Sequence, residues 1–382
     1  MKTPVYLDYA ATTPCDPRVA SVLTQCLTMD GNFANPASRS HFYGWQAEAA
    51  VEKARKQVAG LLNADVREIV WTSGATEANN LAIKGAVLAH AKKGRHIISS
   101  LAEHKAVIDS IRYLEAQGYA VSWLKPDKTG AVSADAIAQA IRPDTVLISI
   151  MHVNNETGSV SDVEAIGKLA EQHDILFHVD AAQSAGKIPL DTQVVKADMI
   201  SVCAHKIYGP KGIGALFVRR KPDFILPAQI HGGGHERGMR SGTLATHQIA
   251  AMGEAFDIAR HEQEKEFQAL SAFKTVFLDK VLKHSCVKLN GDSEHSVPGI
   301  VNLTFQGMDG QVLLSALPML AVSSGSACNS ATVSPSHVLT AMGVSELEAL
   351  SALRFSFGRY TDEEQVHFAA DNLLGVLNKL SG

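Results

Sequence analysis

The stretch 68–77, EIVWTSGATE, joins an apolar run to an alanine-rich run through a short turn that contains glycine. Residues 68–72 are mostly β-branched or aromatic, which predicts a strand. Residues 76–91 are rich in alanine, which predicts a helix directly after that strand. A strand that passes into a helix in this way is the repeating unit of sheets covered by helices, so the stretch predicts an α/β fold.

The same alternation continues outward from this stretch through the first two-thirds of the chain. Short apolar runs predict further strands at 96–99, 145–150, 175–179, 198–202 and 214–218. A helical pattern at 107–117 follows the first of these strands. Strands that alternate with helices favour a mainly parallel sheet that is covered on both faces.

The pattern changes near residue 230. Residues 231–243 are rich in glycine and arginine and predict a loop, and residues 246–282 predict one long helix. A strand at 300–305 and a helical stretch at 362–380 follow. We therefore expect a large domain over residues 15–260. A smaller α/β domain is expected from residues 1–14 together with 261–382, with an exposed loop at 323–335.

Composition narrows the class of protein. The chain has 382 residues, of which 46% are hydrophobic and 19% charged, with a net charge of -4. This balance argues against nucleic-acid or membrane binding through bulk charge. No secretion signal opens the sequence, and no apolar run approaches the ~20 residues that span a bilayer. Five widely spaced cysteines without a C-x-x-C pair argue against disulfides and against a metal site, and favour the cytoplasm.

Three candidates for chemistry follow predicted strands, where ligands of parallel sheets bind. The turn 72–77 leads into a helix, whose exposed N–H groups suit a phosphate, although an ordinary capped turn also fits. Asp180 ends a strand, where it either points into a site or caps the next helix. Lys206 follows the next strand, as a solvated surface residue or as a partly desolvated, nucleophilic amine.

Together the three meet the needs of pyridoxal phosphate. The lysine would bind the cofactor aldehyde as a Schiff base, the carboxylate would keep the pyridine nitrogen protonated, and the helix end would hold the phosphate. A dinucleotide site fits less well, because no G-x-G-x-x-G pattern opens an early helix.

Two further residues stand out toward the C-terminus. Cys328 lies among small polar residues in 323–330, SSGSACNS, a segment that packs poorly and predicts an exposed, reactive thiol rather than a buried, inert one. Arg354 alternates with apolar residues in 353–359, LRFSFGR. It is either a charge on the face of a sheet or an inward clamp for a substrate carboxylate, which its planar guanidinium suits.

These motifs resemble the cysteine desulfurases, PLP-dependent transferases of fold type I in the class-V aminotransferase family. The resemblance covers nearly the whole chain, and its 323–328 loop is similar to the NifS/IscS type. The motifs that carry it are YLDYAATTP (6–14), NPAS (35–38), TSGATE (72–77), EH (103–104), HVNNETG (152–158), HKIYGPKG (205–212), RSGT (240–243) and SSGSAC (323–328). The resemblance implies a large domain with a mainly parallel seven-stranded sheet and a smaller C-terminal α/β domain.

The resemblance also implies roles for individual residues. Lys206 would bind the cofactor covalently and move protons, and His104 would stack on the ring and assist acid–base steps. Thr243 would reach the phosphate from a second subunit, which implies a homodimer. The other cofactor and substrate contacts would be made by Ala75, Thr76, Cys203 and His205 at the phosphate, Asp180 at the ring nitrogen, Asn155 and Gln183 at the phenolic oxygen, and Asn35 and Arg354 at the substrate carboxylate.

The implied reaction converts L-cysteine to L-alanine and leaves the sulfur on Cys328 as a persulfide. The implied partners are sulfur-acceptor proteins: an iron–sulfur scaffold, or sulfur-relay, tRNA-thiolation or DNA-sulfuration proteins. A selenocysteine lyase, another fold-type-I enzyme and a non-catalytic sulfur carrier remain alternatives. An aminotransferase would not need Cys328, and a non-catalytic carrier would not need Lys206, Asp180 and His104.

The sequence departs from the family pattern at two places. Cys203 stands where family members usually have serine, and Ala204 where they usually have glycine. A thiol donates a hydrogen bond more weakly than a hydroxyl, so we expect Cys203 to be a pocket residue without a redox role. The sequence also ends at residue 382, before the tail that docks the scaffold in the iron–sulfur assembly type, so we expect weak scaffold binding.

Overall fold

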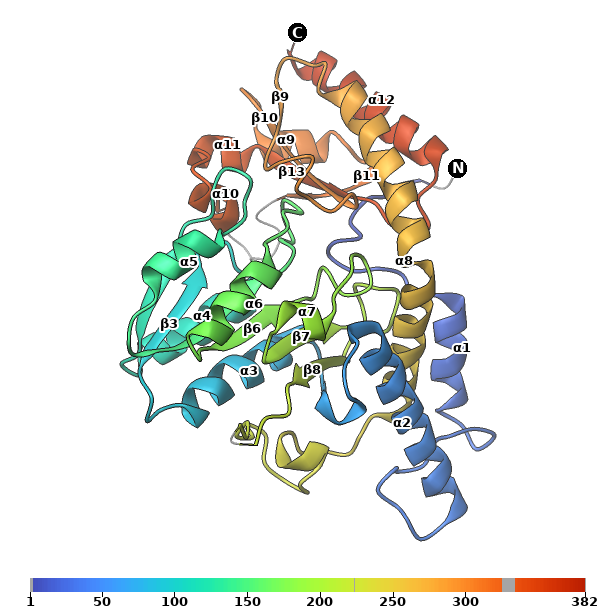
Figure 1. Ribbon diagram of the computed structural model, residues 1–382. Helices are drawn as coiled ribbons and strands as arrows, with labels where there is room; N and C mark the ends of the chain where they lie inside the picture. Colours follow the sequence, from blue (N-terminus) through green and yellow to red (C-terminus); the bar gives the residue numbers. More distant parts are fainter. Residues whose placement is uncertain (1–2, 223, 325–333, 382) are drawn as a thin grey trace.

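A central sheet of seven strands forms the middle of the larger part of the molecule (Figure 1). The computed structural model describes residues 3–222, 224–324 and 334–381. β8 is antiparallel to both of its neighbours, and the other pairs are parallel. In sheet order the strands are β2 (Ile69–Thr72), β8 (Gly214–Val218), β7 (Met199–Cys203), β6 (Leu176–Asp180), β5 (Thr145–Met151), β3 (His96–Ser100) and β4 (Ala120–Leu124).

Helices cover both faces of this sheet, which explains why strands such as β5 are buried along their whole length. One face packs against α3 (Ala75–Ala89) and α4 (Lys105–Glu115). The other face packs against a larger set: α2 (Phe42–Leu62), α5 (Ala134–Ala140), α6 (Val163–Gln172), α7 (Thr192–Val195) and the first half of α8 (Thr246–Val281). The α/β fold with a mainly parallel sheet is therefore confirmed.

A second, four-stranded antiparallel sheet belongs to the smaller part of the molecule, drawn in orange and red in Figure 1. Its order is β12 (Ser323–Ser324), β13 (Ala352–Ser356), β10 (Ile300–Phe305) and β9 (Val287–Leu289). Its core includes residues from the second half of α8 and from α12 (Glu363–Ser381). The remaining helices here are α9 (Gly310–Ser315), α10 (His337–Ala341) and α11 (Glu346–Leu350).

The N-terminal segment links the two parts. β1 (Val5–Tyr6) pairs in parallel with β11 (Leu320–Ala321), and Val5 and Leu7 belong to the core of the smaller part. α1 (Pro17–Gln25) then packs with α8, on the side of the larger part. Two 3₁₀ turns complete the described elements, at Val66–Glu68 and Glu236–Gly238. The domain division at residue 260 stays a prediction, because α8 passes through that residue without a break.

Candidate active site

The N-terminus of α3 faces an open cleft without a side-chain cap. Gly74 is its N-cap residue, makes no side-chain hydrogen bond there, and has a φ of 153° that favours glycine. A Cβ on Gly214 of β8 would lie 2.7 Å from Cα of Gly74, so glycine at 214 lets the two backbones approach closely. Ala75 and Thr76 of the first turn both line the cleft. Their uncapped N–H groups and the positive helix end suit an anion such as a phosphate.

Asp180 supplies a buried carboxylate at the end of β6, in the same cleft. Its Oδ2 accepts a hydrogen bond of 2.7 Å from Asn79 Nδ2, and its Oδ1 accepts one of 3.0 Å from the backbone N of Ala182. These two donors fix the orientation of the carboxylate. A fixed, buried carboxylate is the group that can hold a proton on a pyridine nitrogen by charge pairing.

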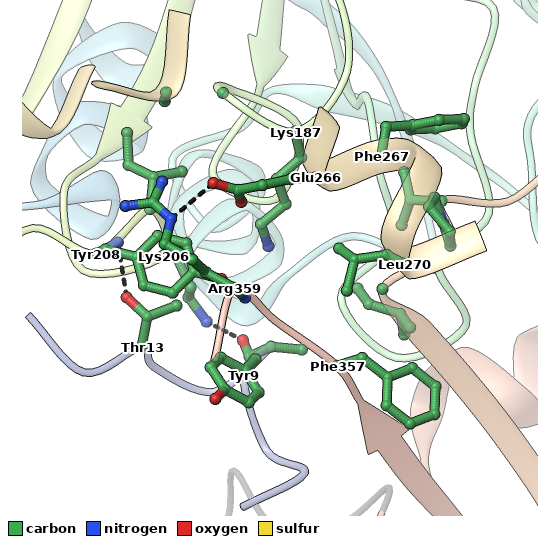
Figure 2. Close-up of a pocket in the computed structure, with 18 residues that line it drawn as sticks. Tyr9, Thr13, Lys187, Lys206, Tyr208, Glu266, Phe267, Leu270, Phe357 and Arg359 are labelled. Carbon is green, nitrogen blue, oxygen red and sulfur yellow. Dashed lines mark hydrogen bonds and ion pairs between the residues drawn. The ribbon is translucent and has the colours of Figure 1, made fainter. Parts of the chain in front are cut away.

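Lys206 lies just beyond β7, on the turn that returns toward β8. Its Nζ donates a hydrogen bond to the backbone oxygen of Ala10 in the N-terminal segment. Figure 2 shows Lys206 close to Thr13 and Tyr208, and Tyr208 N donates to Thr13 Oγ1 at 2.7 Å. The N-terminal segment therefore helps to hold the turn that carries the lysine.

Two histidines in the cleft are held in their neutral forms. Burial lowers the pKa of His104, whose Nδ1 accepts a hydrogen bond of 3.1 Å from the backbone N of Ala106. The proton of the neutral imidazole is therefore on Nε2. Burial, followed by the charge of Lys206, lowers the pKa of His205 to about 4, and its Nδ1 lies 3.2 Å from Thr12 Oγ1. Both rings are thus neutral near pH 7.

Arg354 on β13 brings a buried guanidinium from the smaller part of the molecule to the cleft. It forms an ion pair of 2.7 Å with Asp8 and donates to the backbone oxygen of Asn155 at 2.8 Å. Among the described residues, its buried Nε has no hydrogen-bond partner. The guanidinium could donate hydrogen bonds to a carboxylate in the cleft, which would compete with Asp8 for its N–H groups.

Cys203, the last residue of β7, also lines the cleft and is 2% exposed. Burial raises the pKa of its thiol to about 11, an effect that the charge of Lys206 only partly offsets. Because the thiolate is the reactive form of cysteine, this thiol is a poor nucleophile near neutral pH.

Most of the residues predicted from the sequence meet in this one cleft of about 700 Å³. The predicted residues that line it are Ala75, Thr76, His104, Asn155, Asp180, Gln183, Cys203, His205, Lys206 and Arg354. Cys328 lies outside the described residues. Thr243 is exposed and does not belong to the cleft of its own chain, as the prediction of a contact from a second subunit requires.

Asn35 is the predicted residue that the structure does not bring to this cleft. It lies in a separate hollow with Arg39, Glu48 and Glu236, and its Oδ1 accepts a hydrogen bond of 2.9 Å from Ala37 N. The side chain caps its own turn before α2, at a place where the chain is exposed. Within a single chain, Asn35 therefore lies away from Arg354, and its contact with a substrate carboxylate stays a prediction.

Chain segments on either side of Cys328 meet the cleft or its wall. Ser323 lines the cleft and pairs with Arg354 across β12 and β13. After the undescribed stretch, Ser336 Oγ donates to the buried carboxylate of Glu156, and His337 Nε2 lies 2.9 Å from the backbone oxygen of Glu103. The described residues Ser323, Ser336 and His337, which flank the stretch, thus lie in the cleft or contact residues next to those that line it.

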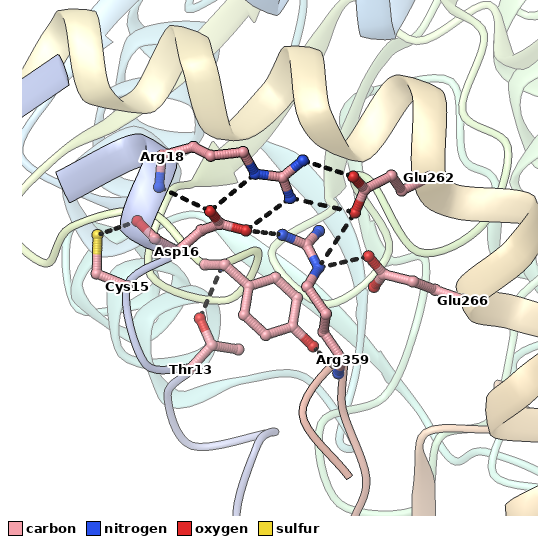
Figure 3. A network of polar contacts seen from close by, with 8 residues as sticks. Thr13, Cys15, Asp16, Arg18, Glu262, Glu266 and Arg359 are labelled. Carbon is pink, nitrogen blue, oxygen red and sulfur yellow. Dashed lines mark hydrogen bonds and ion pairs between the residues drawn. The ribbon is translucent and has the colours of Figure 1, made fainter. Parts of the chain in front are cut away.

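A network of charges around Arg359 contacts Tyr208, which lies on the turn after Lys206; Figure 3 shows the charged residues of this network. Arg359 bonds Asp16 at 2.6 Å and Glu266 of α8 at 2.6 Å, and its guanidinium lies 4.1 Å from the ring centre of Tyr208. Arg18 adds ion pairs to Asp16 at 2.8 Å and to Glu262 of α8 at 2.7 Å. These contacts join the N-terminal segment, α8 and the segment after β13 around the lysine turn.

Two contributors to the site, Asp8 and Asn79, were given no role in the reasoning from sequence. Asn79 is buried among apolar residues of α3, and a polar side chain on the sheet-facing side of a helix is a signal that could have identified it. Asp8 has no such signal, because its contact with Arg354 depends on how the N-terminal segment approaches β13.

The chain is similar to known proteins over nearly its whole length. Residues 5–368 match the family described as Aminotransferase class-V. The cysteine desulfurase IscS of Vibrio vulnificus (strain CMCP6) is 57% identical over 380 residues, which cover 100% of this chain and 94% of that protein. Two solved structures are also similar. A NifS-like protein has a TM-score of 0.90 at 32% identity, covering 99% of both chains. A structure described as SspA in complex with cysteine has a TM-score of 0.83 at 39% identity, covering 94% of this chain and 99% of that one.

Proposed function

The chain belongs to the class-V aminotransferase family as a cysteine desulfurase that depends on pyridoxal phosphate, and we propose that the cleft around Lys206 is its active site. The observation that carries this assignment is the meeting of Lys206, Asp180 and the uncapped N-terminus of α3 in one cleft. Each of the three lies beyond the end of a different strand of the central sheet, where the ligands of parallel sheets bind.

The residues present fit the cofactor. The open end of α3 offers N–H groups for a phosphate, and Asp180 is held in place by Asn79 and by a backbone N–H. Asn79, which lines the same cleft, has a buried Oδ1 without a hydrogen-bond partner in the described part of the chain. When bound, pyridoxal phosphate supplies an electron sink that weakens bonds at the substrate carbon atoms.

Residues of the chain would carry the proton transfers. Lys206 Nζ would take the proton from Cα of the substrate and return a proton during the release of alanine. His104, neutral with its proton on Nε2, could assist the acid–base steps at the substrate. Arg354 would bind the substrate carboxylate through the N–H groups that Asp8 leaves available, which orients the cysteine toward Lys206.

The sulfur would pass to Cys328. In the balanced reaction, L-cysteine and the Cys328 thiol give L-alanine and a Cys328 persulfide: the carbon–sulfur bond of the substrate breaks and a sulfur–sulfur bond forms. The position of Ser323 in the cleft and the contact of His337 with Glu103 support this step, because they anchor both flanks of the Cys328 segment near the substrate. A neutral, buried Cys203 is the weaker nucleophile.

The persulfide implies protein partners that accept sulfur. Such acceptors would be an iron–sulfur scaffold, or sulfur-relay, tRNA-thiolation or DNA-sulfuration proteins. We also propose that the enzyme works as a homodimer in the cytoplasm, in which Thr243 of one copy completes the phosphate site of the other. The exposure of Thr243 outside its own cleft supports this arrangement. Within the described ranges, no helix is long and apolar enough to cross a membrane.

Turnover of L-cysteine tests the assignment. With a thiol reductant, the wild-type enzyme should release sulfide and alanine in equal amounts, and Lys206→Ala should lose both by roughly 10²- to 10⁴-fold or more, since it removes the acid–base group. Lys168→Met, a change at an exposed lysine of α6, is the matched control and should keep full turnover. Near-normal turnover in Lys206→Ala would exclude the proposed site.

A further inference from the structure

Lys187 is a charged residue behind the active site that the proposed reaction does not use. It follows Asp180 on the turn after β6 and lines a second pocket together with Lys206, Glu266 and Phe357 (Figure 2). Burial, then the charge of Lys206, lowers the pKa of Lys187 to about 7; Arg354 acts in the same direction, and Cys203 and Glu266 act against it. Keeping the charged form of Lys187 at this buried position therefore costs free energy, which indicates that the residue has a role there.

Its contacts form one chain of hydrogen bonds with Lys206. Lys187 Nζ donates to Gln183 Oε1 at 2.7 Å, and Gln183 Nε2 donates to the backbone oxygen of Ala10 at 2.8 Å. Lys206 Nζ donates to that same oxygen of Ala10. The amide of Gln183, which is 4% exposed, therefore connects the two lysines.

The two ends of this chain demand the same orientation of the Gln183 amide. The carbonyl oxygen of Ala10 can only accept, so the NH₂ group of Gln183 must face it. Lys187 has N–H groups to donate in both its charged and its neutral form, so the amide oxygen must face Lys187. One N–H of the NH₂ group then remains for an acceptor in the cleft that Gln183 also lines.

We propose that Lys187 is a positioning residue that holds the Gln183 amide with its NH₂ group toward the cofactor cleft. The inference rests on the proposed function, because this NH₂ group matters only if an acceptor such as the phenolic oxygen of the cofactor lies in the cleft. Without Lys187, the buried amide oxygen would lose its donor, and the amide would turn to find another.

A double-mutant cycle on the holoenzyme tests this link. Lys187→Met keeps the chain length but removes the donor. We expect a shifted visible band of the bound cofactor and a release of cofactor on dilution that is roughly two- to tenfold faster, as for the loss of one hydrogen bond. Gln183→Ala should give a similar change, and the double variant should match Gln183→Ala alone. Lys187→Arg should restore the band, and Lys168→Met should leave band and release unchanged.

The variant Gln183→Glu tests the same link while Lys187 stays unchanged. The carboxylate still accepts from Lys187 but has no N–H for the cleft, so we expect the same direction of band shift as in Lys187→Met.

The proposal would be overturned if a folded Lys187→Met kept the wild-type cofactor band and release rate. It would also be overturned if the increases in release rate of the two single variants multiplied in the double variant, or if Gln183→Glu kept the wild-type band. A wild-type enzyme without any visible cofactor band would instead contradict the proposed function itself.

Discussion

At the scale of single residues, different roles are expected for the two cysteines with a proposed connection to the site. Cys203 is buried in the cleft, and its pKa is raised to about 11, so below that pH it stays a thiol. Cys328 follows the cleft residue Ser323 in a segment of small polar residues. Since nucleophilic attack needs a thiolate, the buried thiol of Cys203 suits a place in the wall of the proposed cofactor site, and sulfur transfer stays a proposal for Cys328.

This contrast predicts that Cys203→Ser is a mild change. Serine matches cysteine closely in size and donates a stronger hydrogen bond, so the variant should keep its turnover and hold the cofactor equally well or better. The measurement is sulfide release together with the rate of cofactor loss from the holoenzyme. A drop in turnover of more than about tenfold, roughly 1.4 kcal/mol, would show that the Cys203 thiol takes part in the reaction.

At the scale of elements, the ends of strands were predictable and the contacts between turns were not. The strands at 145–150 and 214–218 and the helix at 76–91 are confirmed within one or two residues, because long apolar or alanine-rich runs leave few alternatives. Asp180 and Lys206 could be found for the same reason, since each follows such a strand. β4 was not predicted. It is an edge strand whose residues are all half-buried, so its sequence shows only a weak pattern of apolar residues.

The supporting contacts join residues that are far apart in the sequence, and a local sequence pattern does not reveal such contacts. Asp8 reaches Arg354, and Ala10 reaches both Lys206 and Gln183, only because the N-terminal segment passes from the smaller part of the molecule to the larger one. Asn35 shows the opposite case. Its motif matches the family, but in a single chain the loop before α2 carries it to a separate hollow.

At the scale of the whole molecule, the proposed active site lies where its two parts join. The larger sheet supplies Asp180 and the lysine turn, the smaller sheet supplies Arg354, and α8 contributes to the cores of both parts (Figure 1). The charge network around Arg359 holds these pieces together behind Lys206. A substrate in the cleft would therefore contact both parts at once.

The proposed homodimer predicts complementation between two defective variants. Lys206→Ala chains lack the proton-transfer group, and Thr243→Ala chains should hold the cofactor less tightly, because a hydrogen bond to the phosphate is missing. In a mixed dimer, the Lys206→Ala copy would offer its Thr243 to the site that keeps Lys206, so one complete site should form. We expect cofactor release at the wild-type rate from that site. Release as fast as from the pure Thr243→Ala enzyme would show that Thr243 acts within its own chain or not at all.

The central claim is that sulfur from L-cysteine becomes a persulfide on Cys328, and peptide mass spectrometry of enzyme stopped during turnover tests it most directly. After brief reaction with L-cysteine and blocking of free thiols, one extra sulfur atom is expected on the peptide that contains Cys328. Cys328→Ser should retain the cofactor yet form no persulfide and release no sulfide. Extra sulfur on the Cys203 peptide instead, or full turnover in Cys328→Ser, would contradict the account.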